Sequence, residues 1–332
     1  MLRRLFVLVV LSTACDAPAT GESPAPERPA AAASAPAAAL TPRLATVELL
    51  DAGQEPRAPL QIRVTPGQTE SLAVVVKIGV GIDAEFQRAD HTATPSIALR
   101  ATFTARTVDS SGDATYDMVL DELRLHDPAA ASPTIKTAYE ATLADISPIR
   151  GTMTRTDRGV PTALELRAPA DLQPRSRIQH EILAGVVADL LPVFPDEPVG
   201  VGARWTVRQQ VRLNDITVDG EARVELRERD RDRCRLALTL NPSARPQKLD
   251  NAILPTSRHE LSALAGSGTG AMQIDLTRVA PREAHSSLML QASNLTESLG
   301  MQSTIKTSLS VDVEAHSLDD AGAAATARSS EP

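Results

Sequence analysis

The sequence predicts a mainly β (α+β) protein, built as a large curved antiparallel sheet or open half-barrel with two or three helices. Two observations lead to this fold class. Apolar and polar residues alternate with a period of two over many stretches, and only a few segments show the helical period instead. Strands that alternate in this way have one buried face and one face in water, which is typical of antiparallel sheets.

The N-terminus has the features of an export signal. Arg3 and Arg4 precede an apolar run from Leu5 to Leu11, and three small residues follow it. A membrane-spanning helix needs about 20 apolar residues, so this run is too short to cross a bilayer. We therefore expect residues 1–14 to be a signal peptide that is removed on export.

The segment LSTAC, which ends at Cys15, resembles the lipobox of bacterial lipoproteins, although Leu11 lies one residue before the usual leucine position and Ser12 takes its place. The resemblance implies that Cys15 carries a lipid anchor. The mature chain would then be held in the cell envelope, at the periplasmic face of the outer membrane in preference to the inner membrane. The alternative is an ordinary cleavage site after small residues, which gives a soluble periplasmic protein.

Low-complexity segments border the part of the chain that we expect to fold. Residues 15–42 are assigned to the lipidated cysteine and a disordered linker, because the segment is rich in Ala and Pro and has no apolar periodicity. Residues 321–332 are expected to be a disordered tail for the same reason. Residues 43–320 are then long enough for a single β-rich domain.

Alternating stretches predict the strands of this domain. In SIALRATFTARTV the residues Ile97, Leu99 and Phe103 share one face, and in GMQSTIKTSLSVDVEAH so do Ile305 and Leu309. Turn signals such as DSSGD separate these stretches. Further strands are predicted for AVVVKIGVGI, ATYDMVLDELRL, ARWTVRQQVRL, DGEARVELRE, CRLALTL and AMQIDL.

Three segments have the helical period. The strongest is PRSRIQHEILAGVVADLL, residues 174–191, which places Ile178, Ile182 and Val186 at four-residue spacing between two prolines. The segment PTIKTAYEATLADI, residues 133–146, is the second, and TSRHELSALA, residues 256–265, is a weaker third.

The order of elements favours two similar halves, 43–170 and 195–318, joined by the helix 174–191. GTMTRTDRGVP from Gly151 and GAMQIDLTRVAP from Gly270 share several residues in order, and the strand pairs that precede them have a similar offset. Each half then reads β-β-β-α-β-β. The identity between the halves is too low to show common ancestry, so independent halves are the alternative.

Charge and composition exclude several classes of partner and activity. The net charge is −8 without a basic cluster, so we do not expect nucleic acid as a partner. Aromatic residues make up only 2% of the chain, which argues against carbohydrate binding. The six histidines have no metal-binding spacing, GxSxG, CxxC and P-loop motifs are absent, and Cys234 is expected to be a small buried residue. We therefore expect no enzyme activity, no cofactor and no metal.

The segment FPDEPVGVGARW, Phe194 to Trp205, contains the pattern P-V-x-V-G-x-x-W. Together with the hairpin GTMTRTDRGVPTALEL it is similar to a family of exported bacterial lipoproteins of unknown function, which implies a related fold and no activity. Long strands with one apolar face also resemble, more distantly, the half-barrel carriers of the LolA and LolB kind, in which helices cap an apolar concavity.

The second resemblance implies a non-enzymatic carrier that binds a lipid or acyl chain in the half-barrel, with the helices around Tyr139 and Ile182 as a lid. The alternative is a structural or interaction lipoprotein with a closed core that binds another envelope protein. The inward residues of the predicted strands line the ligand site in the first case and form the core in the second. These residues are Val76, Ile78, Phe103, Trp205, Val207, Leu236, Leu238, Ile305 and Leu309.

The lipobox resemblance predicts that the Cys15→Ala variant loses its membrane attachment. The protein should move from the detergent phase to the aqueous phase, while its thermal unfolding stays unchanged because the linker separates the anchor from the folded part. Phase partition and intact-mass measurement test this. An unmodified mature N-terminus at Cys15 or later in the unmutated protein would contradict the prediction.

Overall fold

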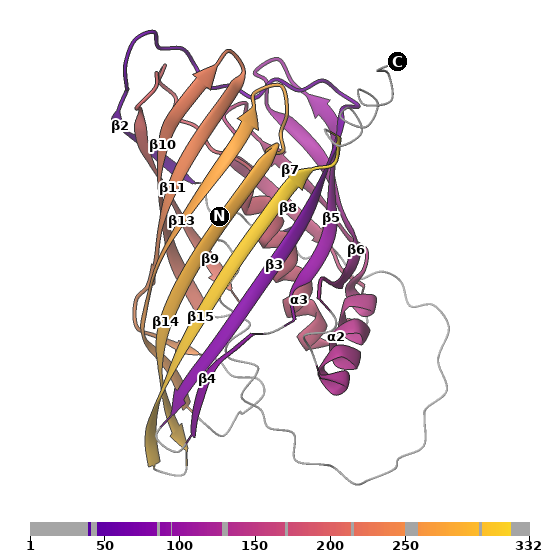
Figure 1. The fold of residues 1–332 in the computed structure, drawn as a ribbon, viewed down its shortest axis with the longest axis vertical. Helices are drawn as coiled ribbons and strands as arrows, with labels where there is room; N and C mark the ends of the chain where they lie inside the picture. Colours follow the sequence, from indigo (N-terminus) through magenta and orange to yellow (C-terminus); the bar gives the residue numbers. More distant parts are fainter. Residues whose placement is uncertain are drawn as a thin grey trace, which may run out of the picture.

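A computed structural model describes residues 39–40, 45–84, 87–93, 95–127, 132–169, 172–213, 216–249, 258–298 and 301–319. These residues form one antiparallel sheet of 15 strands and two α-helices, and the sheet curves around the longer helix (Figure 1). The predicted fold class, a mainly β protein of the open half-barrel type, is confirmed. Cys15, the predicted signal peptide and the predicted tail lie outside the described residues.

The elements have the following bounds: β1 Ala39–Leu40, β2 Thr46–Asp51, β3 Thr69–Ala84, β4 Gln87–Ala93, β5 Ile97–Val108, β6 Ala114–Leu125, α2 Pro133–Ile146, β7 Ile149–Arg155, β8 Pro161–Arg167, α3 Pro174–Asp189, β9 Arg204–Leu213, β10 Ile216–Asp230, β11 Arg233–Ala244, β12 Gln247–Leu249, β13 Arg258–Asp275, β14 Glu283–Ser298 and β15 Met301–Ser317.

Thirteen strands follow one another in the order β1-β8-β7-β6-β5-β3-β15-β14-β13-β11-β10-β9-β2, while β4 pairs with β3 and β12 with β13. The first half of the chain and the second half therefore form two meanders, which meet where β3 pairs with β15 and Val76 lies opposite Val313. Within the described residues β1 and β2 do not pair with each other, so the sheet is unclosed. Six peptide units join Leu40 to Thr46, which limits the opening between these two edges to about 20 Å.

Helix α3 occupies the concave side of the sheet (Figure 1). Leu183 and Val187 are fully buried, the residues between them are buried as well, and so are Leu190 and Leu191 just after the helix. The C-terminal half of α3 is therefore part of the core, and each Leu or Val side chain buried there stabilises the fold by about 1.5–3 kcal/mol.

Helix α2 is peripheral by comparison. Its N-terminus is capped by Ser132, whose hydroxyl accepts a hydrogen bond from the Ile135 backbone N–H at 3.4 Å. Only Leu143 and Ile146, in its last turns, are buried, whereas Ile135 is exposed. Helix α2 packs against α3 and β6, and Tyr139 near its middle is partly buried against the core as well.

The segment between β2 and β3 covers one end of the curved sheet. Ile62 N–H donates to the Asp157 carbonyl in the β7–β8 turn at 2.6 Å, and Arg63 N–H donates to the Leu276 carbonyl after β13 at 2.7 Å. These two turns belong to opposite halves of the sheet, so the segment crosses the opening between them. Leu60 and Ile62 are buried where it does so.

The predicted third helix, residues 256–265, is wrong, because its described part belongs to strand β13. A β-bulge between Leu261 and Ala263 shifts the alternation by one residue, so Leu261 and Leu264 both face the core. These two leucines are three residues apart, which is also the spacing of neighbouring side chains on one face of a helix. As a result, the described residues of the second half contain no helix. The predicted β-β-β-α-β-β order therefore does not hold for this half.

The predicted linker also extends too far toward the folded part. Ala39 and Leu40 lie within residues 15–42, yet they form β1 and pair with Glu165 and Leu164 of β8. An edge strand presents unpaired backbone groups, and even an Ala-rich segment can satisfy them because this pairing requires no large side chain.

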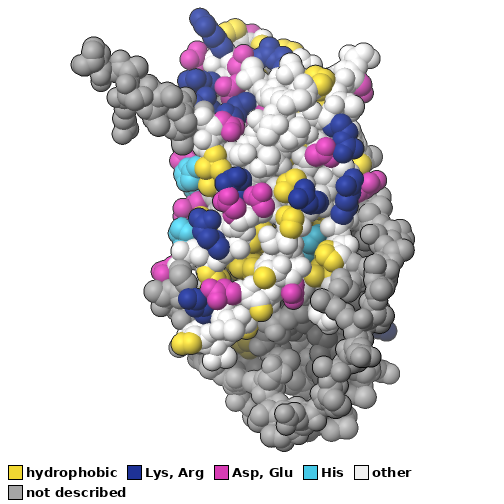
Figure 2. Space-filling view, turned by 90° about the vertical axis from the view of Figure 1, so that its right-hand side faces the viewer, with side chains coloured by type: hydrophobic (Ala, Val, Ile, Leu, Met, Phe, Trp, Pro, Cys, Tyr) yellow, Lys and Arg dark blue, Asp and Glu magenta, His cyan; other side chains and the backbone are white. Residues whose placement is uncertain are grey.

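The outer face of the sheet carries charges of both signs. Figure 2 shows Lys and Arg side chains interspersed with Asp and Glu on one such face. Cross-strand ion pairs contribute to this pattern, including Lys77 with Glu314 at 2.9 Å and Arg208 with Glu221 at 3.0 Å. Exposed pairs of this kind each stabilise the fold by at most about 1 kcal/mol, so the outer face adds solubility more than stability.

Three glycines in β13, Gly266, Gly268 and Gly270, allow the tight curvature of the second half. Their positions face the core, because Gly268 pairs with Leu240 on one side and Leu288 on the other. A Cβ atom on Gly268 would lie 2.4 Å from the Ser287 carbonyl oxygen. Only glycine permits the neighbouring strand to come this close.

We expect Gly268→Val to destabilise the protein by about 1–3 kcal/mol, because the added side chain must push β14 away. Thr269→Val is the matched control, since Thr269 is the next residue of the strand and is exposed. The control should stay within about 0.5 kcal/mol of the unmutated protein. Equal urea midpoints for the two variants would contradict this account of the curvature.

Candidate functional site

The nine predicted lining residues occupy inward positions of the curved sheet, and eight of them belong to or pack against one apolar core that also contains residues of α3. Two of them differ from the rest. Val207 is partly buried against this core, and Ile305 is partly exposed and lies outside it. The structure therefore brings most of the predicted residues together in the same core as α3. The seven buried members are Val76, Ile78, Phe103, Trp205, Leu236, Leu238 and Leu309.

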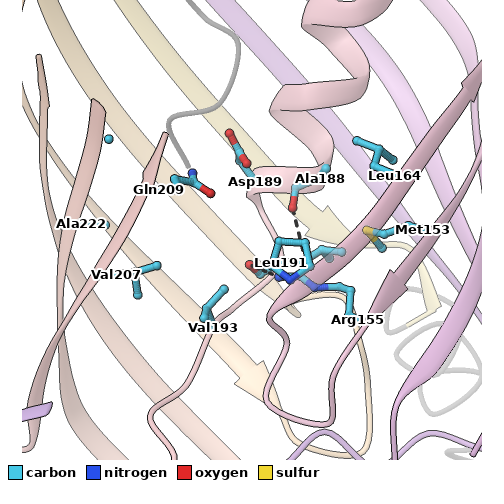
Figure 3. A pocket seen from close by; sticks show the side chains of 12 residues that line it. Met153, Arg155, Leu164, Ala188, Asp189, Leu191, Val193, Val207, Gln209 and Ala222 are labelled. Atoms are coloured by element: carbon cyan, nitrogen blue, oxygen red, sulfur yellow. Dashed lines mark hydrogen bonds between the residues drawn. The ribbon is translucent and has the colours of Figure 1, made fainter. Parts of the chain in front are cut away.

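A cavity of about 50 Å³ remains where the two outer parts of the sheet approach the end of α3. Its walls come from β7 and β8 on one side, from β9 and β10 on the other, and from the last turn of α3 (Figure 3). This volume suits one or two water molecules, each of which takes about 30 Å³ in the liquid. Sites for ligands of ordinary size measure about 300–1,000 Å³.

Arg155 is the central polar residue of this region, although it is 2% exposed. Its Nε donates to the Gly159 carbonyl at 2.6 Å, and its terminal nitrogens donate to the carbonyls of Ala188, Leu191 and Pro192 at 3.3–3.5 Å. Figure 3 shows the guanidinium turned toward the end of α3. The last carbonyls of a helix have no partner within it and carry partial negative charge, so a cation is favourable there.

Asp189 and Gln209 line the same cavity as Arg155. Asp189 is at the end of α3 and Gln209 is in β9, so the cavity lies between the helix and this outer part of the sheet. Polar groups around so small a space form hydrogen bonds with a water molecule or with each other. We find no arrangement of nucleophile and base within the lining.

Glu70 is a second buried charge, at the other edge of the core. Its carboxylate accepts hydrogen bonds from the backbone N–H groups of Ala280 at 2.9 Å and Val279 at 3.2 Å, and from Gln68 Nε2 at 2.7 Å. Burial raises the pKa of this carboxyl above its ordinary value, while the two backbone donors and Arg278 act in the opposite direction. Glu70 therefore holds the β13–β14 turn against the start of β3.

Sequence reasoning missed both Arg155 and Glu70, although a signal for them exists. Each occupies an inward position of an alternating strand: Glu70 pairs with Phe103, and Arg155 pairs with Ala114. A charged residue at an inward position of a strand indicates a buried polar contact, because an unpaired buried charge is too costly to keep.

Trp205 and Cys234 have structural roles here. The Trp205 side chain is fully buried, and its Nε1 donates to the Val193 carbonyl at 3.0 Å, which ties the segment after α3 to β9. Burial raises the pKa of the Cys234 thiol to about 11. The thiolate is the reactive form, so Cys234 is a poor nucleophile at neutral pH.

The described residues carry no further group that indicates a metal site or a membrane-spanning helix. They contain no group of three or more His, Cys, Asp or Glu side chains that could hold a metal ion. They also contain no helix with the length and hydropathy needed to cross a bilayer.

No protein-family model matches this chain, and no curated protein is similar to it at a significant level.

We expect Arg155→Met to lower the free energy of unfolding by about 3 kcal/mol or more, because several buried carbonyls lose their donor at once. Arg150→Met is the matched control, since Arg150 lies in the same strand and is exposed. The control should change the free energy of unfolding by about 0.5 kcal/mol or less. Chemical denaturation measures both values, and a similar loss in the two variants would show that Arg155 does not hold α3.

Proposed function

We propose that this protein is a non-enzymatic, lipid-anchored component of the bacterial cell envelope that acts by binding another envelope molecule on its outer surface. In this proposal the concave face of the half-barrel is the protein's own core. The observation that carries it is the burial of the C-terminal half of α3, from Ile182 to Ala188, in the same core as the inward residues of the sheet.

The packing of α3 supports this proposal over a carrier function. Leu183, Val187 and Leu190 are fully buried, and the cavity beside them has a volume of about 50 Å³. An acyl chain could enter only if α3 left. Each Leu or Val exposed in that movement would cost about 1.5–3 kcal/mol.

A carrier of lipids or acyl chains remains the second proposal, because the inward face of the sheet is apolar along most of its strands. A ligand that displaced α3 would meet a continuous apolar surface. Ile305 is partly exposed near the N-terminal end of β15, and such a ligand would enter there. This proposal requires α3 to be a movable lid.

Two measurements separate the proposals. Native mass spectrometry of the protein purified from its own envelope should show the mass of the chain and its N-terminal lipid alone. Val187→Asp should unfold the protein or cost several kcal/mol, because it buries an unpaired charge. Ala138→Asp, at an exposed position of α2, is the control and should cost about 0.5 kcal/mol or less.

A bound lipid in the native spectrum would overturn the closed-core proposal. So would a folded Val187→Asp protein that takes up more lipid than the unmutated chain, since a charge in α3 would then open the concave face. Because the native spectrum uses the unmutated protein, the test does not depend on whether the variant folds.

A further inference from the structure

An exposed methionine lies in the middle of the outer face of β13, β14 and β15, which run side by side at the front of Figure 1. Met289 of β14 is 41% exposed although it is a large apolar residue. Its direct partners in the two neighbouring strands are Ser267 of β13 and Ser310 of β15, both of which are short and uncharged. Met289 therefore stands above its surroundings on this face.

The surface around Met289 has few charges compared with the rest of the outer face. We call it the Met289 face and define it as the outward residues of the ranges 263–271, 285–293 and 306–314. Its charged residues, apart from a histidine in β14, are Lys306, Asp312 and Glu314, all in β15. Charged residues are depleted and methionine is enriched at the centres of protein interfaces. The composition of this face is therefore that of a docking surface.

The order of the charges along β15 makes the Met289 face complementary to itself. Lys306 lies four residues before Ser310, and Glu314 lies four residues after it. All three side chains lie on the outer side of the sheet, because β15 pairs with β14 without a bulge between them. A two-fold axis that crosses the strands at Ser310 places Lys306 of one copy opposite Glu314 of the other, and this happens twice in a dimer.

The neighbouring residues are compatible with the same axis. Met289 of one copy would meet Met289 of the other, because it pairs with Ser310, which lies on the axis. Asp312 would face Ser308, and Ser287 would face Gln291, so acceptors meet side chains that can donate. No two like charges of the Met289 face would then be directly opposed.

The size of the Met289 face sets the strength of such a contact. Nine residues of a strand span about 30 Å and three strands span about 14 Å, which gives about 400 Å² per copy and about 800 Å² in total. Stable complexes bury about 1,200–2,000 Å², and smaller interfaces belong to transient ones. A dimer on this face is therefore weak and forms at high local concentration.

We propose that this protein forms a transient two-fold dimer through the Met289 face, so the molecule that docks there is a second copy of the same chain. The two sheets would stack face to face with their β15 strands antiparallel. The inference goes beyond the proposed function, because it names the docking surface and the partner. It requires neither the closed core nor the lipid anchor.

The test is cross-linking of the purified full chain with a short bismaleimide, followed by a denaturing gel. Ser310→Cys places a thiol on the proposed axis, so the two thiols of a dimer lie close together. It should give cross-linked dimer at least ten times faster than Thr162→Cys, the matched control, since Thr162 is exposed in β8, far from β15 in the sheet. Both variants keep Cys15 and Cys234, so their difference reports on the introduced thiols alone.

A charge swap tests the arrangement of the two copies. In the Ser310→Cys background, Lys306→Glu and Glu314→Lys should each lower the rate of cross-linking at least fivefold, because like charges then face each other twice. The double variant should return to within about twofold of the starting rate. Within one chain these two residues are about 27 Å apart along the strand, so only contact between copies explains a rescue.

Three results would overturn the proposal. Equal rates for Ser310→Cys and Thr162→Cys would show that the chains meet by random collision. Single charge variants that cross-link at the starting rate, or a double variant without rescue, would show that Lys306 does not face Glu314 of another copy. The native spectrum tests the closed core separately, since a lipid bound on the concave face would leave the cross-linking rates unchanged.

Discussion

The fold depends on one constraint: a curved sheet that does not close must have its apolar concave face covered by another part of the chain. Helix α3 contributes to this cover with its apolar C-terminal half, in which Leu183 and Val187 are fully buried. It also lies between β8 and β9 in the chain, so it connects the two meanders. The same helix therefore fills the core and holds together the halves that surround it.

Buried charges complete the structure where the sheet ends. Arg155 donates to carbonyls at the end of α3, and Glu70 accepts from backbone N–H groups in the β13–β14 turn. Backbone groups in turns and at helix ends cannot join the strand ladder, yet they need partners when buried. A single charged side chain reaches several of them at once, which offsets the cost of its own burial.

Alternation along the chain was sufficient to predict most strands, because each has one face against the core. It failed in β13, where the bulge between Leu261 and Ala263 changes the face on which residues lie. It also carried information that was overlooked, since Glu70 and Arg155 are charged residues at inward positions. The cavity beside Arg155 was beyond such reasoning, because Asp189 of α3 and Gln209 of β9 come to line the same space only in the fold.

The sequence by itself determined which side chains share a face in most strands, and that a helix with an apolar C-terminal half begins at Pro174. Only the tertiary structure decided what covers the apolar face: Leu183 and Val187 of α3 are buried in the same core as Val76 and Leu236. The physical reason is that a period of two identifies the inner side of a strand but contains no information about what lies opposite it. Val76 and Leu236 have the same pattern whether they face a lipid or α3. The packing of a helix more than 90 residues after Val76 and more than 40 before Leu236 makes them core.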